Sequence, residues 1–221
     1  MEDEKNKGVD YVFLLSLLFF VSSALYSQEN IGTFENPIID SNMSFEQAFE
    51  GISQDCPLYI KNRQRLISVK YYSFDNKIHQ GQLIIDRDLV NDIEFAFQEA
   101  LKEKFPIYSV IPISHISFRK NGKWDDNLSM EANNTSSFNY REITGRQRLS
   151  LHARGRAIDI NPVQNPYING NIILPLNSNY NRAARGTLTR ENIIVISLLS
   201  RGWVWGGNWT TPKDYQHLQK E

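Results

Sequence analysis

Two stretches of this sequence each place a histidine close to a carboxylate, which is the arrangement that metal-dependent hydrolysis needs. The first, SLHARGRAIDINP at 150–162, contains His152 and Asp159, and the second, WVWGGNWTTPKDYQH at 203–217, contains Asp214 and His217. Catalytic zinc takes three protein ligands of the nitrogen or carboxylate type and keeps a fourth position open for water. Two imidazoles and one carboxylate make such a set. Residue types alone leave the choice open, because histidines also occur in cores and on solvated surfaces.

The first stretch fits the pattern SxHxxGxAxD at every specified position. The five matching residues are Ser150, His152, Gly155, Ala157 and Asp159. This pattern resembles the signature of the zinc D-alanyl-D-alanine carboxypeptidases and L-alanyl-D-glutamate endopeptidases of bacteria and their phages, the VanY-like peptidoglycan peptidases. Against average residue usage, such a match arises by chance about once in ten thousand chains of this length.

Flanking segments extend the resemblance over residues 128–217. The NPY element at 165–167, the WVWGGNW element at 203–209 and the DYQH ending at 214–217 are similar to the endopeptidase branch, and TSSFNYR at 135–141 resembles the segment before the first zinc histidine. One departure is Leu218, which stands where the family usually has an aromatic residue. We expect that change to affect packing or a subsite and to leave the ligands untouched.

The resemblance implies a ligand set and a general base. His152, Asp159 and His217 would ligate Zn²⁺, and Asp214 would exchange protons with the attacking water and the leaving amine. Asp214 precedes His217 by three residues, so the two side chains point apart on a flat strand. We therefore expect a bend between them.

The resemblance also implies roles on the substrate side. Arg141 would stabilise the oxyanion or hold a substrate carboxylate, because a guanidinium stays charged and donates in a planar fork. An ordinary surface salt bridge is the alternative. Ser150 would hydrogen-bond the substrate or a metal ligand, and a loop-capping hydroxyl is equally compatible with its position.

The tryptophans and glycines of the second stretch have structural interpretations. Trp203, Trp205 and Trp209 alternate like strand residues, so we expect two of them in the core and one along the cleft. Gly206 and Gly207 would form a sharp turn, where glycine reaches angles that strain other residues and lets the backbone approach closely.

Upstream elements must position these residues. The β-branched and aromatic run at 66–74 and the segment at 82–86 predict a hairpin. Apolar residues at helical spacing predict an amphipathic helix over 88–104. Short strands are expected at 107–111 and 115–118.

A second helix is predicted over 189–201, capped by Thr189 and ended by Gly202. Strands and helices do not alternate regularly, which favours an α+β class over a parallel α/β sheet. The resemblance implies a single small domain with an antiparallel sheet and flanking helices, of the Hedgehog/D,D-peptidase type.

The N-terminal region differs from the rest of the chain. An apolar run at 11–21 is followed by small residues, and its length suits a signal peptide better than the ~20 residues of a spanning helix. The start MEDEKNKGVD is acidic, which is unusual for an export signal. Residues 1–27 are therefore interpreted as a signal peptide or a retained N-terminal membrane anchor, 28–43 as a linker and 44–221 as the catalytic domain.

Composition restricts the partners. The chain has 24 basic and 25 acidic residues, so it has no excess of positive charge that would attract nucleic acid. The single cysteine, Cys56, excludes an intramolecular disulfide. We predict a monomer without a stable protein partner.

These features together predict an exported enzyme, periplasmic or extracellular, that hydrolyses peptide bonds in peptidoglycan stems with Zn²⁺. The bond cut would be that of an L-alanyl-D-glutamate endopeptidase or a D-alanyl-D-alanine carboxypeptidase. The alternative is a non-catalytic, zinc-stabilised module that binds cell wall. A structural zinc normally has four protein ligands, so three ligands plus Asp214 favour the enzyme.

Overall fold

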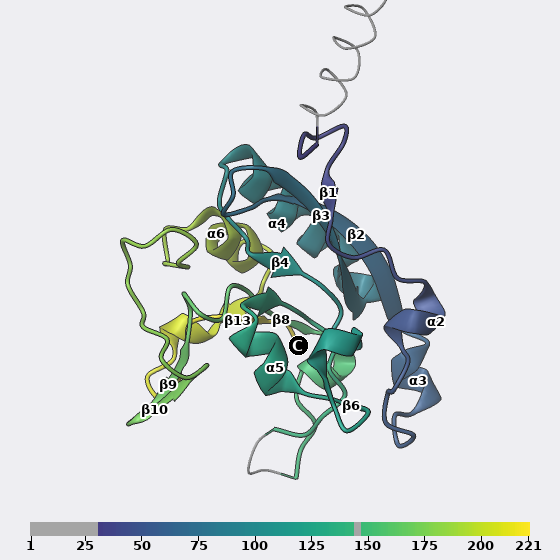
Figure 1. Cartoon of the computed structure of the whole chain (residues 1–221). Coiled ribbons are helices and arrows are strands. Elements are labelled where there is room, and N and C mark those ends of the chain that lie inside the picture. Colours follow the sequence, from purple (N-terminus) through teal and green to yellow (C-terminus); the bar gives the residue numbers. More distant parts are fainter. Residues whose placement is uncertain (1–30, 144–146) are drawn as a thin grey trace, which may run out of the picture.

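The longest strands of the protein form a β-hairpin of β2 (Gln64–Tyr72) and β3 (Ile78–Asp86) in the computed structural model, which describes residues 31–143 and 147–221. The two strands pair antiparallel along their whole length. The hairpin predicted at 66–74 and 82–86 is therefore confirmed. Figure 1 shows it curving along one side of the molecule.

A short strand, β1 (Ile38–Ile39), pairs parallel with β3 and completes a sheet of order β1-β3-β2. Beyond it, Ser41 is buried and its hydroxyl donates to Gln82 Oε1 over 2.7 Å. Part of the segment predicted as a linker thus packs on the hairpin. The predicted signal or anchor at 1–27 lies outside the described residues. No helix within the described ranges is long and apolar enough to cross a membrane.

The helix α4 (Val90–Lys102) packs against β2 and against a later helix, α6 (Ile193–Leu199). Its buried apolar residues recur at the three- and four-residue spacing of one helix face: Ile93, Ala96, Phe97 and Ala100. The 3₁₀ turn η1 (Arg87–Leu89) precedes it, and the Asp86 carboxylate accepts a hydrogen bond from the Asp88 amide over 3.0 Å. The amphipathic helix predicted over 88–104 is confirmed.

The second long helix, α6 (Ile193–Leu199), is shorter than predicted. Its N-cap is Asn192, whose side chain accepts from the Ile194 amide over 3.0 Å, so the predicted Thr189 cap is wrong. Thr189 instead forms an earlier turn, in which its carbonyl accepts from the Asn192 amide. Asparagine caps helices better than threonine and stands directly before the apolar run. Gly202 follows the helix with φ of 82°, as the predicted stop requires.

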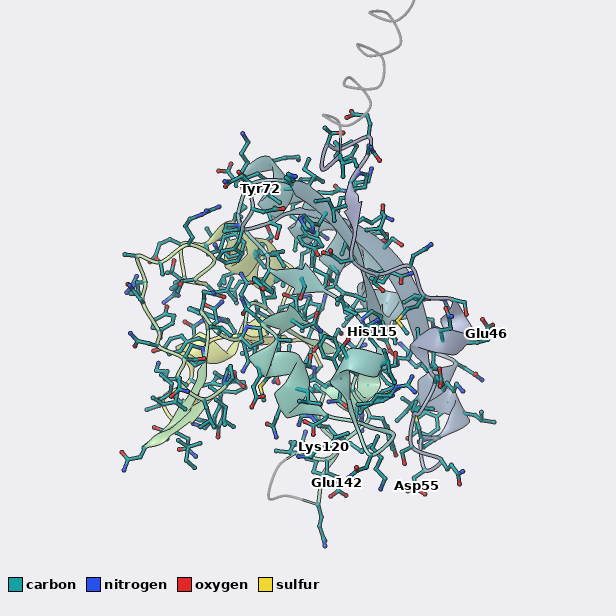
Figure 2. The ribbon with its side chains drawn as sticks, in the orientation of Figure 1. Glu46, Asp55, Tyr72, His115, Lys120 and Glu142 are labelled. Carbon is teal, nitrogen blue, oxygen red and sulfur yellow. The ribbon has the colours of Figure 1, made fainter. Side chains whose placement is uncertain are left out.

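One predicted strand is wrong. Residues 115–118 form a 3₁₀ turn, η2 (Ile116–Phe118), because His115 caps it: the ring Nδ1 accepts from the Ser117 amide over 3.3 Å. Figure 2 shows His115 on the side of the molecule toward α2 (Phe45–Ala48). His115 is one of the residues that line a pocket there. The other short elements of this region are α2 (Phe45–Ala48), α3 (Leu58–Lys61), β4 (Ser109–Val110), β5 (Arg119–Lys120), β6 (Lys123–Trp124), α5 (Asp126–Glu131) and β7 (Asn134–Thr135). Of the strand predicted at 107–111, only β4 forms.

Two three-stranded antiparallel sheets carry the residues of chemical interest. The first has the order β11-β13-β8 and the second the order β10-β9-β12. Their strands are β8 (Ala157–Asp159), β9 (Tyr167–Asn169), β10 (Ile172–Leu174), β11 (Val204–Trp205), β12 (Lys213–Asp214) and β13 (His217–Gln219). The main core joins residues of α4 and α6 to residues of β2, β3, β8 and β13. This mixture of helices and small sheets agrees with the predicted α+β class.

Candidate metal centre

Three predicted ligands, His152, Asp159 and His217, meet at one buried point. Each offers one ligand atom, and these atoms lie within 4.8 Å of one another. Nε2 of His152 lies 3.1 Å from Nδ1 of His217 and 3.1 Å from Oδ2 of Asp159. Nδ1 of His217 lies 2.9 Å from Oδ1 of Asp159. Residues far apart in sequence therefore form a compact group that could hold a metal ion.

Sheet register explains how two of the three converge. In the pairing of β13 with β8, His217 lies directly opposite Asp159. Residues directly opposite each other in an antiparallel pair present their side chains on the same face. The bend expected before His217 is confirmed at residues 215–216, between β12 and β13.

The third ligand is carried by the 3₁₀ turn η3 (His152–Arg154), which Gly155 ends in the left-handed conformation with φ of 65°. A Cβ on Gly155 would lie 2.0 Å from Oε1 of Gln64 and 2.8 Å from the amide nitrogen of Asp86. The glycine of the signature is therefore needed twice, for its backbone angle and for close packing on the hairpin.

Outer hydrogen bonds orient both imidazoles. Nδ1 of His152 lies 2.6 Å from the carbonyl oxygen of Ser137, and Nε2 of His217 lies 2.8 Å from Oε1 of Gln219. An amide oxygen only accepts, so each outer nitrogen donates, and in the neutral ring the inner nitrogen then has its lone pair toward Asp159. Two lone pairs and a carboxylate that face one point suit a bound cation. Metal-binding histidines typically donate a hydrogen bond from their other ring nitrogen to a protein acceptor, as both histidines do here. The donor set thus fits zinc.

The charges in this group are strongly coupled. Burial opposes ionisation of Asp159, but His152 and His217 outweigh it and hold the pKa of Asp159 far below its usual value. Burial lowers the pKa of His217 as well, yet the hydrogen bond to Asp159 prevails and raises that pKa to about 9. The group therefore favours positive charge at its centre.

The predicted general base, Asp214, stands beside these three side chains. Its backbone pairs with Tyr167 of the NPY element, which places it at the end of β12. Its Oδ1 is buried and has no hydrogen-bond partner among the described residues. Burial raises the pKa of Asp214 to about 6, against the opposing charges of His217 and His152. A carboxyl group with this pKa can exchange protons near neutral pH.

Packing at η4 (Gly206–Asn208) fixes the position of Asp214. A Cβ on Gly206 would lie 2.5 Å from the Asp214 carbonyl oxygen, so the close backbone approach predicted for this glycine is confirmed. Neither Gly206 nor Gly207 has a positive φ, so the expectation of a special backbone angle is wrong. Gly206 is required because a side chain there would collide with Asp214.

The tryptophans divide as predicted. Trp203 and Trp205 are each 3% exposed and lie in the main core, whereas Trp209 is half-buried with its ring centroid 5.5 Å from that of His217. Leu218, the departure from the family pattern, is fully buried in the main core. Side chains alternate along a strand, so Leu218 points away from the face that carries His217.

Arg141 and Ser150 lie next to the turn that carries His152. The Ser150 amide donates to the Arg141 carbonyl over 3.1 Å, and the Ser150 hydroxyl accepts from the His152 amide over 3.2 Å. Ser150 is therefore placed as a loop cap. Nη2 of Arg141 pairs with Oδ2 of Asp126 at 2.8 Å, while its Nε is buried without a partner among the described residues.

Two buried asparagines support the site: Asn165 belongs to the NPY element, but the supporting role of neither asparagine was predicted from the sequence. Nδ2 of Asn161 donates to the carbonyls of Pro106 and Gly186, and Nδ2 of Asn165 also donates to Gly186. Both asparagines are fully buried. They join the strand that carries Asp159 to the loop before α6. Only the NP dipeptides that follow β8 hinted at a turn there.

Two imidazoles, one carboxylate and a neighbouring half-buried acid define a candidate metal-dependent hydrolase site. Residues 144–220 match the family model described as D-alanyl-D-alanine carboxypeptidase. The matched region includes His152, Asp159, Asp214 and His217, and the predicted resemblance to this peptidase family is confirmed. No curated protein and no solved structure matches the chain. The match supports a cell-wall peptidase class, and the endopeptidase branch stays a prediction.

Proposed function

We propose that this protein is a zinc-dependent peptidase that hydrolyses the stem peptides of peptidoglycan. The observation that carries the proposal is the convergence of His152, Asp159 and His217 within a region that matches a peptidase family. Three buried donors of this type leave a tetrahedral ion one position for a non-protein ligand, which is the arrangement of catalytic zinc.

Asp214, Arg141 and Asp126 would have different roles in the hydrolysis. His152, Asp159 and His217 would hold the zinc ion, which would supply Lewis acidity and lower the pKa of a bound water from about 15.7 to about 7. Asp214, when ionised, accepts a proton from the attacking water and returns it to the leaving amine. Arg141 donates to the oxygen that gains negative charge or to a substrate carboxylate. Asp126 holds the Arg141 guanidinium in place.

Two bonds of the stem are candidates for cleavage. The DYQH ending and the WGG element favour the bond between L-alanine and D-glutamate. The description of the matching family favours the D-alanyl-D-alanine bond. We propose the endopeptidase reaction and treat the carboxypeptidase reaction as the alternative outcome. The same proposal includes a monomeric domain of the Hedgehog/D,D-peptidase type over residues 44–221.

The proposed substrate lies outside the cytoplasm, so the protein must be exported. Residues 1–27 would serve as the signal peptide or membrane anchor. Ser150, whose hydroxyl accepts from the His152 amide, would also form a hydrogen bond with the substrate. A cell-wall-binding module without catalysis is the competing function. The buried Oδ1 of Asp214 argues against it, because it has no hydrogen-bond partner in the part of the chain that the structure describes, and an unpaired buried polar atom is costly unless it has a use.

Mass spectrometry of muropeptides tests the proposal. Purified protein with added Zn²⁺ should release fragments whose masses identify the cleaved bond, and Asp214→Asn should bind the same material without cleaving it. Exhaustive chelation should abolish release and zinc should restore it. Full cleavage by the chelated protein or by the Asp214 variant would show that the chemistry is different, and binding of sacculi without cleavage would establish the wall-binding module.

A further inference from the structure

The side chain of Gln219 contacts the outer nitrogen of one predicted ligand. Its Oε1 lies 2.8 Å from Nε2 of His217, and both residues belong to β13. Residues two apart in a strand point to the same face, so strand geometry holds the amide beside the imidazole.

The two imidazoles are oriented by different means. The outer nitrogen of His152 donates to a main-chain carbonyl, that of Ser137, and Ser137 is itself anchored by a hydrogen bond of 2.6 Å from its hydroxyl to the Ala157 carbonyl. The outer nitrogen of His217 has a side chain as its partner, the amide of Gln219. A main-chain acceptor is present whatever residue stands there, whereas the acceptor for His217 depends on the residue at position 219.

We propose that Gln219 is a positioning residue of the metal centre, which sets the tautomer of His217 by accepting the proton of Nε2 and so leaves Nδ1 free to bind the ion. This inference rests on the metal role proposed for His217 and adds a residue to which no role was assigned from the sequence. Outer partners of metal-binding histidines fix ring orientation and raise ligand basicity, and their loss costs about 10–100-fold in metal affinity.

The neighbours of Gln219 explain how its amide reaches the imidazole. Ala157 lies directly opposite Gln219 on β8 and is fully buried. Opposed residues share a face, so a larger side chain at 157 would compete with Gln219 for the same space. The small alanine of the signature pattern therefore leaves room for the hydrogen bond between Gln219 and His217. Val204, on the other neighbouring strand, is also opposite Gln219 but is 47% exposed.

Zinc affinity is the first test. The full-length chain, Gln219→Leu and Gln219→Glu should be titrated with Zn²⁺ against a chromogenic chelator. Gln219→Leu should bind zinc 10–100-fold more weakly. Gln219→Glu should bind at least as tightly as the original chain, because a carboxylate is also an acceptor. The matched control is Val204→Ala, which alters the same face of the sheet without touching an imidazole and should change affinity less than twofold. Unchanged affinity in Gln219→Leu would overturn the proposal.

Nitrogen-15 NMR of the imidazoles is the second test, and it needs no metal. At alkaline pH, where the His217 ring is neutral, His217 of the original chain should carry its proton on Nε2. Gln219→Leu should show a mixture of tautomers, while Val204→Ala should not. A proton on Nδ1 of His217 in the original chain would overturn the proposal even if zinc bound well. Failure of the original chain to bind zinc would instead defeat the proposed function and leave the NMR result as the test of Gln219.

Discussion

Replacing Gly206 with alanine should separate catalysis from metal binding. The new Cβ would lie 2.5 Å from the carbonyl oxygen of Asp214 and 2.9 Å from its Cβ. Ordinary contacts of a Cβ begin at 3.4 Å, so the Asp214 backbone must shift by about 0.9 Å. Misplacing a catalytic group by about 1 Å costs about 100-fold in rate, or about 2.7 kcal/mol of transition-state stabilisation. Gly206 contacts none of the three ligands in this way, so zinc affinity should stay within about twofold.

The assay is release of stem fragments, followed with zinc affinity and thermal unfolding of the same samples. Gly170→Ala is the matched control, because nothing lies within 4 Å of its added Cβ although its φ is 58°. That control should lose about 1 kcal/mol of stability and keep kcat. Wild-type kcat in Gly206→Ala, with zinc affinity and folding intact, would refute the claim that this glycine fixes the position of the general base.

Three further results are expected. Asp92→Ala should lower the free energy of unfolding by about 2 kcal/mol in denaturant titrations, because it removes the carboxylate that accepts from the buried Trp203 Nε1–H over 2.9 Å. The control, Glu94→Ala at an exposed position of the same helix, should change the free energy of unfolding by less than about 0.5 kcal/mol. Because burial raises the pKa of Asp214 to about 6 and its ionised form is the base, kcat/KM should be half-maximal near pH 6 and fall further as the pH drops below that value. A flat profile down to pH 4.5 would contradict this role. Zn²⁺ at about 100 times its Kd should stabilise the folded protein by about 2.7 kcal/mol and raise its melting temperature in calorimetry, whereas Ca²⁺, which prefers oxygen ligands, should not.

Local patterns predicted the larger elements of the fold. The hairpin β2–β3 and the helix α4 follow from β-branched runs and from apolar residues at helical spacing, signals that reside within one segment. The strand expected at 115–118 is wrong because the His115 ring caps a 3₁₀ turn. The pairing of β1 with β3 could not be predicted, because two residues carry no periodic signal and their partner lies forty residues away.

The candidate site shows the same division. The signature pattern led to His152, Asp159 and His217 because the chemistry restricts which residue types can stand there. Ser137 acts through its carbonyl, which any residue possesses, so its contact with His152 is invisible in sequence. Gln219 lies one residue beyond the recognised departure at 218, and its contact depends on strand geometry. A hydrogen bond such as that of Gln219 with His217 can be recognised only when the register of β8 and β13 is known.

A crystal structure of the zinc-loaded protein, with anomalous data at the zinc edge, would show whether His152, Asp159 and His217 hold the metal. We expect one zinc ion held by Nε2 of His152, a carboxylate oxygen of Asp159 and Nδ1 of His217, with its remaining position open to water and facing Asp214. Metal–nitrogen distances should be about 2.0–2.1 Å. A zinc ion at another position, or a fourth protein ligand closing this one, would contradict the proposal that the chain is a hydrolase.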